Sequence, residues 1–147
     1  MMQALNLPPY DHKVSKREGK VYIWDQIRKK YLRLTPEEWV RQHFIAFLLS
    51  KGYSKGRIGV ETGVKVNQLQ RRSDIVVYDK EGKPYLLIEC KAPSVKLTNE
   101  TFGQAAQYNV RLKAPYLCIT NGLQHYSCSI DFAQKNYKFL ADIPEPQ

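Results

Sequence analysis

Apolar residues recur at helical spacing in two parts of the chain. The first runs over residues 36–50, and its start has Thr35 as a helix cap, a proline at the first helical position and a glutamate three residues after the cap. Gly52 is expected to end this helix. The second runs from about residue 99 to residue 112 and stops before Pro115. The sequence therefore predicts two helices, each of three to four turns.

Short alternating or apolar runs between these segments predict strands. The expected strands cover residues 20–24, 60–66, 73–79, 84–92, 116–120, 124–130 and 137–141. Residues 1–19 show no periodicity and are interpreted as an extended N-terminal arm. The order of one helix, three strands, a helix and two or three strands predicts an α/β fold with a mixed central sheet flanked by helices (an α-βββ-α-β core), formed by residues 1–147 as a single domain.

An acidic residue is expected on the inner side of the first helix. On a helical wheel, Glu37 falls near the middle of the apolar arc that contains Val40 and Phe44, whereas Glu38 lies at its edge. Arg41 follows Glu37 by four positions and is a possible ion-pair partner. Glu37 is the favoured inward acid, and Glu38 remains its rival because helix boundaries are uncertain by a few residues.

The two strands before the second helix form a predicted hairpin. Residues 80–83 include Gly82 and are typical of a tight turn, and a loop of either two or four residues gives the same register. In that register Asp74 faces Glu89 on the neighbouring strand, and Lys91 projects from the same face. The sequence thus predicts that two carboxylates and one ammonium group converge.

This arrangement has the chemistry of a divalent metal site. Hard carboxylate oxygens from Asp74 and Glu89 suit Mg²⁺ or Mn²⁺. A bound metal would lower the pKa of a water molecule and shield charge on a scissile phosphate. Lys91 would either orient that water or stabilise the transition state, and Glu37 would complete the site directly or through a water molecule. Glu-x-Lys alone is a common salt-bridge pattern. Its place on apolar strands, where unpaired acids are costly, favours the functional interpretation.

The charge of the chain is concentrated in its first half. The formal net charge is +9, and residues 1–73 contain 15 Lys and Arg against 6 Asp and Glu, whereas residues 74–147 contain 8 of each. A basic, tyrosine-containing half favours a polyanionic partner such as nucleic acid. A solvated, solubilising surface is the alternative explanation.

Several other classes of protein are disfavoured. Three cysteines at positions 90, 118 and 128 lie among apolar or small residues and are interpreted as buried thiols, and the three histidines lack the spacing of a zinc site. There is no phosphate-binding loop of an ATP motor. No apolar run approaches the roughly 18 residues of a membrane span, so a cytoplasmic protein is expected.

The combined motifs resemble a known family. Ser73-Asp74, followed by Glu89-Cys90-Lys91 after 14 intervening residues, is similar to the PD-(D/E)xK nuclease motif. The wider pattern, with residues 34–42, residues 72–78 and Phe102-x-Gln104-x-x-x-Tyr108, resembles the N-terminal endonuclease domain of type I restriction enzyme R subunits.

The resemblance implies a magnesium-dependent DNA endonuclease. It assigns metal binding to Asp74 and Glu89, catalysis to Lys91, a contributing acid to Glu37, and substrate contact to Gln104 and Tyr108. A Gln or Tyr side chain on a helix can hydrogen-bond a phosphate, and a Tyr ring can stack on a base.

The sequence departs from that family in two respects. Ser73 stands where the motif has proline, a change that the motif tolerates. The ATP-driven motor of R subunits is missing, so motor and specificity subunits of a restriction system are expected partners, and the chain is a standalone relative, a fragment or one subunit of several. Two alternatives stay open: a non-catalytic nucleic-acid-binding or assembly module, and a nuclease acting on RNA or repair intermediates.

Overall fold

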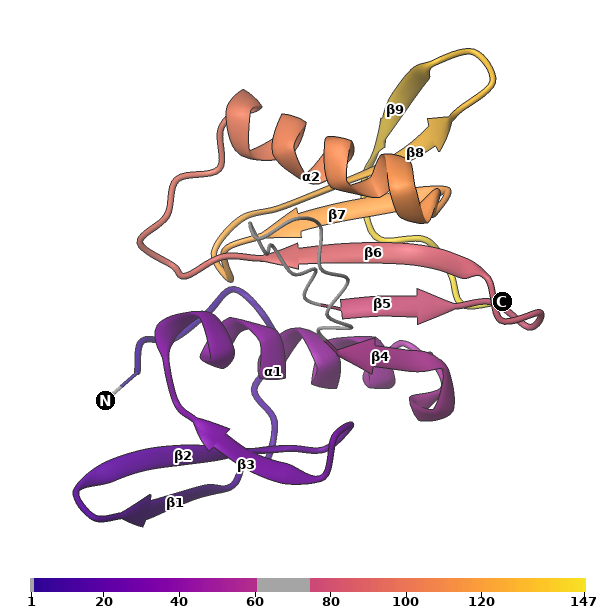
Figure 1. The fold of residues 1–147 in the computed structure, drawn as a ribbon. Coiled ribbons are helices and arrows are strands. Elements are labelled where there is room, and N and C mark those ends of the chain that lie inside the picture. The colour runs from indigo at the N-terminus through magenta and orange to yellow at the C-terminus, as the bar shows by residue number, and fades with distance from the viewer. Residues whose placement is uncertain (1, 61–74) are drawn as a thin grey trace.

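The described part of the chain forms two sheets and two α-helices in four layers. The computed structural model describes residues 2–60 and 75–147. Helix α2 covers one face of the larger sheet, helix α1 covers the other, and a small sheet lies beyond α1 (Figure 1). The elements in chain order are β1 (Val14–Arg17), β2 (Lys20–Asp25), β3 (Lys30–Arg33), α1 (Pro36–Ser50), the short 3₁₀ helix η1 (Lys55–Arg57), β4 (Ile58–Val60), β5 (Ile75–Tyr78), β6 (Pro84–Cys90), α2 (Asn99–Leu112), β7 (Tyr116–Thr120), β8 (His125–Asp131) and β9 (Asn136–Leu140).

The larger sheet has six strands, and their order in space follows their order in the chain, from β4 to β9. All neighbouring pairs are antiparallel except β6 and β7, which are parallel. A parallel pair needs a crossover connection, and α2 supplies it. The α/β class with a mixed sheet between helices is therefore confirmed.

Each face of the six-stranded sheet packs against one helix. Val77 and Ile88 belong to the core cluster beneath α1, whereas Val76 and Leu87 belong to the cluster beneath α2. Successive strand residues point to opposite faces, so strands that are covered on both sides need continuous apolar runs. This requirement explains why the sequence is apolar at both odd and even positions of β5 and β6.

Helix α1 begins where its capping residues predict. The Thr35 hydroxyl oxygen accepts a hydrogen bond from the backbone N–H of Glu38 at 3.0 Å, which satisfies one of the donors left free in the first turn. The helix ends at Ser50, and Gly52 follows with φ of +100°, a conformation that favours glycine. The predicted bounds of α2, over residues 99–112, agree with the structure as well.

The predicted register of the β5–β6 hairpin is confirmed for three pairs. Ile75 faces Ile88, and the next two pairs keep that register. The expected turn was wrong, however, because the Asp79 carboxylate accepts bonds from the N–H groups of Glu81 and Lys83 and makes a loop of five residues. A register shift between Val77 and Tyr78 compensates for the extra residue.

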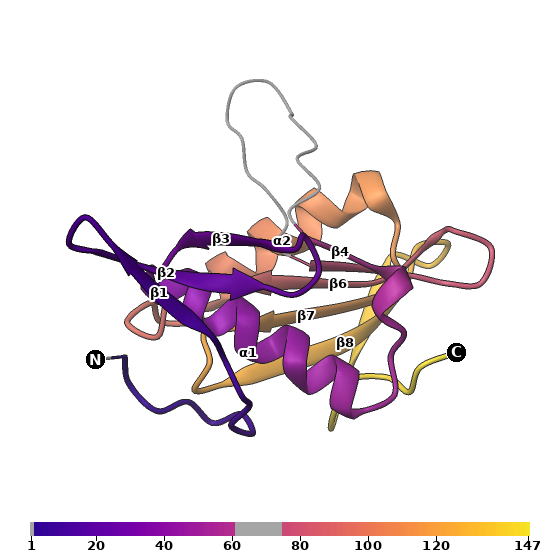
Figure 2. The ribbon, with the colours of Figure 1, turned by 90° about the horizontal axis from the view of Figure 1, so that it is seen from below.

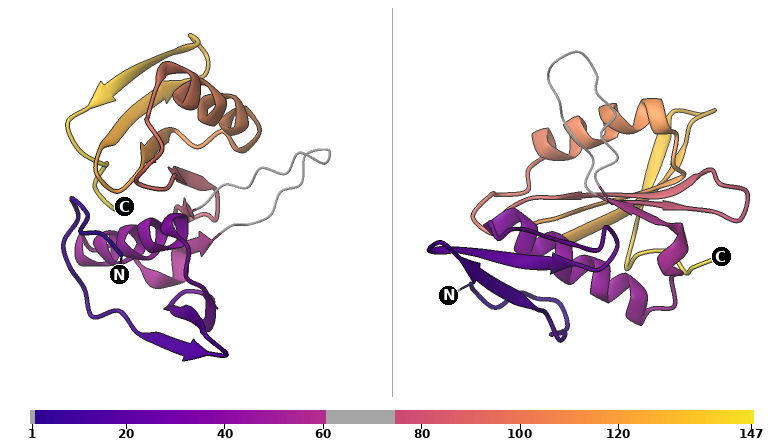
Figure 3. Two further views of the ribbon diagram at one scale, coloured as in Figure 1. Left: turned by 90° about the vertical axis from the view of Figure 1, so that its left-hand side faces the viewer. Right: turned by 60° about the horizontal axis from the view of Figure 1, so that its bottom comes forward.

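The N-terminal region departs from the extended arm expected over residues 1–19. Strand β1 forms within it, and β1, β2 and β3 make an antiparallel three-stranded sheet. Figures 2 and 3 show this sheet on the side of α1 that faces away from the six-stranded sheet. The strand predicted over residues 60–66 begins earlier, as β4, and its remaining part lies outside the described residues.

Candidate functional site

Strand β6 positions the most informative pair of polar side chains. Glu89 is its penultimate residue, and the Lys91 Nζ lies 3.3 Å from the Glu89 Oε2. The side chains are 14% and 28% exposed, respectively, so the ion pair is largely sheltered yet reachable from solvent. The backbone N–H of Lys91 donates to the Thr120 carbonyl at 2.8 Å, which fixes the chain just after the strand. The predicted convergence of Glu89 and Lys91 is thus confirmed.

The ion pair lies on the α2 side of the sheet. Leu87 packs in the cluster beneath α2, and Glu89, two positions later on the same strand, projects from the same face. Glu89 pairs with Ile119 of β7 across the parallel ladder. Asp74 and Ser73 lie outside the described residues, although the neighbouring pair Ile75 and Ile88 has the register on which the prediction for Asp74 was based.

The two glutamates of α1 have surroundings that differ from the expectation. Glu38, placed at the edge by the helical wheel, is only 7% exposed, and its carboxylate accepts bonds from Arg41 and from the Gln42 side chain, the latter at 2.7 Å. Glu37 is half-buried. The prediction that Glu37 is the inward acid of α1 was therefore wrong with respect to burial: its rival Glu38, expected at the edge of the apolar arc, is the more buried acid, and Arg41 binds Glu38.

The first turn of α1, which contains both glutamates, lies on the same side of the molecule as the C-terminal end of β6 (Figure 1). Helix α1 nevertheless packs on the face opposite to α2. The start of α1 and Glu89 therefore lie near the same edge of the six-stranded sheet but on opposite faces of it.

The two candidate substrate residues on α2 differ in exposure. Gln104 is exposed, whereas Tyr108 packs partly buried against the cluster that contains Leu87. The Tyr108 hydroxyl is buried and has no hydrogen-bond partner among the described residues. An unsatisfied hydroxyl on the sheet face that also holds Glu89 is unusual, because burying it without a partner costs free energy.

A buried charge network was missed at the sequence level. Asp25, at the end of β2, accepts bonds from the backbone N–H groups of Ile27 and Arg28 and from the Arg28 guanidinium at 2.8 Å. Arg28 also lies 3.9 Å from Glu38. Burial alone would raise the pKa of Asp25, but the hydrogen bonds from Arg28 and Ile27 outweigh it and lower the pKa. The i,i+3 spacings of Asp25–Arg28 and Glu38–Arg41 were the available signal.

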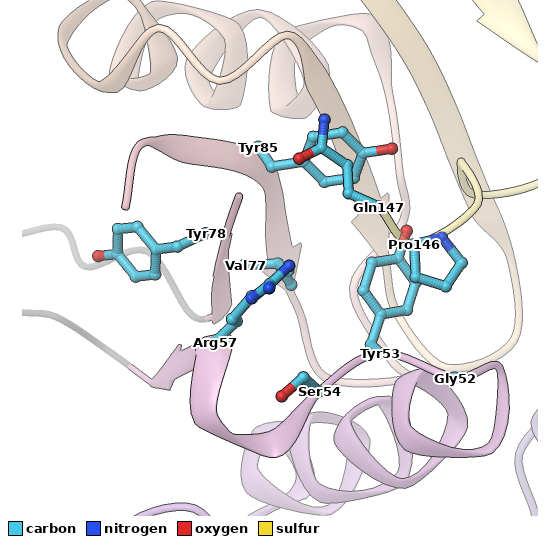
Figure 4. A pocket seen from close by; sticks show the side chains of 9 residues that line it. All are labelled: Gly52, Tyr53, Ser54, Arg57, Val77, Tyr78, Tyr85, Pro146 and Gln147. Carbon is cyan, nitrogen blue, oxygen red and sulfur yellow. The ribbon is translucent and has the colours of Figure 1, made fainter. Parts of the chain in front are cut away.

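A pocket near the hairpin turn is separate from the ion pair. It has a volume of about 110 Å³ and is lined in part by Tyr53, Arg57, Tyr85 and the C-terminal Gln147 (Figure 4). Tyr85 and Glu89 are four positions apart on β6, or about 13 Å along a strand. The Tyr85 hydroxyl donates to the Glu145 carbonyl at 2.6 Å. This hydrogen bond holds the C-terminal segment against the end of β6 that is distant from Glu89.

The three cysteines are buried and free of disulfides, which confirms their interpretation as core thiols. Burial raises the pKa of Cys118 to about 12 and that of Cys128 to about 11, so neither thiol is an effective nucleophile near neutral pH. Within residues 2–60 and 75–147, no three His, Cys, Asp or Glu side chains gather as a metal-binding group.

None of the described helices is long and apolar enough to cross a membrane.

The layers and the Glu89–Lys91 pair define the class of the protein as a mixed α/β domain with a polar site at the end of a central strand. The family described as type I restriction enzyme R protein N terminus (HSDR_N) matches residues 36–144. The chain belongs to this family. No curated protein matches it.

A solved structure has a similar fold. It is the fragment structure of a protein named as an HsdR subunit of a type I restriction enzyme from Vibrio vulnificus YJ016, with a TM-score of 0.56 and 18% sequence identity. The match covers 77% of this chain and 24% of that one. The chain therefore spans about a quarter of the length of that structure, and the likeness concerns the fold.

Proposed function

We propose that the protein is a metal-dependent endonuclease domain that hydrolyses DNA phosphodiester bonds in a restriction system. The observation that carries the proposal is the Glu89–Lys91 pair at 3.3 Å, largely sheltered at the end of β6, in a chain of the R protein N-terminal family. Asp74, which directly precedes β5 in the sequence, is the proposed second carboxylate. Motor and specificity subunits are the proposed protein partners.

The donor set fits a hard divalent cation. Glu89 supplies a carboxylate that water can reach, and Mg²⁺ binds through one or two carboxylates while keeping several waters. Such an ion supplies a nucleophilic water and neutralises charge on the phosphate. Lys91, held beside Glu89, would stabilise the developing negative charge, and Glu37 is the proposed supporting acid. Gln104 and Tyr108 are proposed to contact the substrate, and the exposed position of Gln104 on α2 supports this role.

The test compares matched carboxylate variants. Magnesium binding is measured by calorimetry for the wild type, Glu89→Gln, Asp74→Asn and the control Glu81→Gln, whose side chain is 75% exposed on the β5–β6 loop. Each sample is then incubated with plasmid DNA and Mg²⁺. We expect Glu89→Gln and Asp74→Asn to lose metal binding and at least 100-fold in nicking rate, on the order of the effect of removing one stabilising group, and Glu81→Gln to match the wild type.

Cleavage by Glu89→Gln at the wild-type rate would exclude the proposed site. Metal binding by the wild type without cleavage would indicate an intact site that needs a motor or specificity subunit. Absence of both would favour a non-catalytic binding or assembly module. Parallel incubation with RNA separates a deoxyribonuclease from a ribonuclease, a distinction that the fold does not make.

A further inference from the structure

The small sheet presents a basic and aromatic face that the candidate site does not use. Side chains alternate along strands, and directly opposed residues share a face. The register pairs Arg17 with Lys20, Tyr22 with Arg33, and Trp24 with Tyr31. One face of the β1–β2–β3 sheet, which we call the basic face, therefore contains Arg17, Lys20, Tyr22, Trp24, Tyr31 and Arg33.

Contacts within the basic face confirm that its members lie together. The Arg17 guanidinium carbon lies 5.2 Å from the centre of the Tyr31 ring and 5.9 Å from that of Tyr22. The Tyr31 ring in turn meets Trp24 edge-on, with ring centres 5.1 Å apart. Stacking on an aromatic ring orients a guanidinium and leaves its N–H groups directed outwards in the guanidinium plane, where they can donate hydrogen bonds to an anion.

The described acids do not neutralise the cations of the basic face. Arg17, Lys20 and Arg33 are exposed, and in the part of the chain that the structure describes no carboxylate forms an ion pair with any of them. Asp25, the acid of β2, is fully buried and bound to Arg28. Glu18 is in the turn between β1 and β2. Three cations with no acid on their strand face form a surface that suits a polyanion.

One end of the small sheet lies towards the same end of the molecule as the candidate site, although α1 and the six-stranded sheet lie between the basic face and the α2 side of the sheet. The turn that joins β1 and β2 lies on the same side of the molecule as the C-terminal end of β6 and the start of α1, in both Figure 1 and Figure 2. A ligand reaching from the small sheet to Glu89 would have to be an extended polymer. This requirement favours a nucleic acid over a small anion such as free phosphate.

We propose that the basic face binds the phosphate backbone of duplex DNA. The aromatic rings are half-buried and two of them already contact Arg17, so they support the cations and are not open platforms for unstacked bases. This feature favours duplex backbone over single-stranded DNA. The assignment of DNA as the polymer rests on the proposed function.

The test measures the salt dependence of DNA binding with metal removed. Fluorescence anisotropy in EDTA compares two 20-base-pair duplexes of unrelated sequence over a range of salt concentrations. The variants are the triple substitution Arg17→Gln, Lys20→Gln, Arg33→Gln and a control with the same charge change, Lys80→Gln, Lys135→Gln, Lys138→Gln, from exposed positions elsewhere. Circular dichroism establishes that each variant is folded, and the single variant Arg33→Gln provides a milder change.

Each lost phosphate contact lowers the slope of log K against log salt by about 0.9. We expect the triple basic-face variant to lower the slope by about 2.7, and Arg33→Gln by about 0.9, equally for both duplexes. The control variant should change the slope by less than about 0.9, the value expected for one phosphate contact. Equal slopes for the two triple variants, tighter binding of single-stranded DNA, or no duplex binding by the wild type would overturn the proposal.

Nicking assays with Mg²⁺ on the same proteins separate this proposal from the proposed function. Glu89→Gln should keep the wild-type salt slope and lose cleavage, whereas the basic-face variant should lose cleavage only in proportion to lost binding. If the wild type binds duplex with the predicted slope changes but never cleaves, the basic face stands and the nuclease assignment fails. If cleavage is normal in the basic-face variant at low DNA concentration, the basic face is not the binding surface.

Discussion

At the scale of single residues, the two neighbouring glutamates of α1 differ in what they contact. The Glu38 carboxylate is buried and binds Arg41 and Gln42, and Arg41 is itself only 6% exposed. Removing one partner of a buried ion pair leaves the other charge uncompensated, at a cost of about 3 kcal/mol or more. We expect Glu38→Ala to lower the free energy of unfolding by roughly that amount, measured by urea denaturation.

Glu37→Ala is the matched comparison, because it removes the same group one position earlier from a half-buried place. We expect it to cost less than about 1 kcal/mol, as is usual for exposed or partly exposed charges, and to reduce cleavage in the nicking assay. Equal destabilisation by the two substitutions would show that the buried network does not distinguish them.

His43 gives a prediction about pH. It is buried, and its Nδ1 donates to the Trp39 carbonyl at 2.9 Å. Burial lowers its pKa, and nearby His12 lowers it further, although the hydrogen bond to Trp39 opposes the shift. The unfolded chain therefore takes up a proton at His43 at higher pH than the folded chain does, and stability falls as pH decreases below about 6.5.

We expect His43→Gln to lack this contribution, so that the difference in unfolding free energy between variant and wild type changes between pH 7.5 and pH 5. Thermal denaturation at several pH values measures it. A constant difference across this range would contradict the assigned origin of the shift.

Contacts between residues close in the sequence could be predicted, whereas contacts with residues from a distant part of the chain could not. Glu89 and Lys91 share a strand face by simple alternation, so their contact was predictable. One neighbour of the buried Glu38 is Arg28, which comes from the loop after β2. A helical wheel contains no information on that neighbour. The wheel therefore predicted that Glu37 is more buried than Glu38, which is the reverse of what the structure shows. The place of Asp74 stays a prediction.

At the scale of elements, the start of α1 depends on one side chain. The Thr35 hydroxyl caps the helix, and replacing a threonine cap with alanine typically costs about 1 kcal/mol. We expect Thr35→Ala to lower the unfolding free energy by that amount, whereas Thr35→Ser, which keeps the oxygen, should cost little. Urea denaturation of the two variants measures the difference, and identical losses would show that the methyl group of threonine is what matters.

The register of β5 and β6 was predicted correctly, although the turn on which the prediction was based is wrong. The β5–β6 register was predicted from a short turn, but the chain makes a longer loop and restores the register by an irregularity next to Tyr78. The apolar faces of both strands demand that register, since a slip by one residue would exchange their two faces. Strands β1 and β3 were missed because they are short and polar, and they are strands chiefly because β2 pairs with both.

At the scale of the whole molecule, the fold class was predictable because both faces of the central strands are apolar. Such runs occur in sheets that are covered by helices on each side, and the two core clusters are the result. The additional layer beyond α1 was not predictable from the same pattern. One of its contacts with α1 is the ion pair between Arg28 and Glu38, and Arg28 also binds the buried Asp25. In the sequence these three residues look like ordinary surface residues.

The sequential order of strands in the larger sheet also determines how the chain acquires its fold. Most described strand pairs join segments close in sequence, so each can form soon after its own turn closes. The parallel pair is different, because Ile88 and Cys118 are 30 positions apart and α2 lies between them. Closing that loop costs conformational entropy before any ladder contact repays it, which makes this crossover the natural barrier to folding. Glu89 is in that same ladder, opposite Ile119, so we expect the environment of the candidate site to be completed only when this crossover closes.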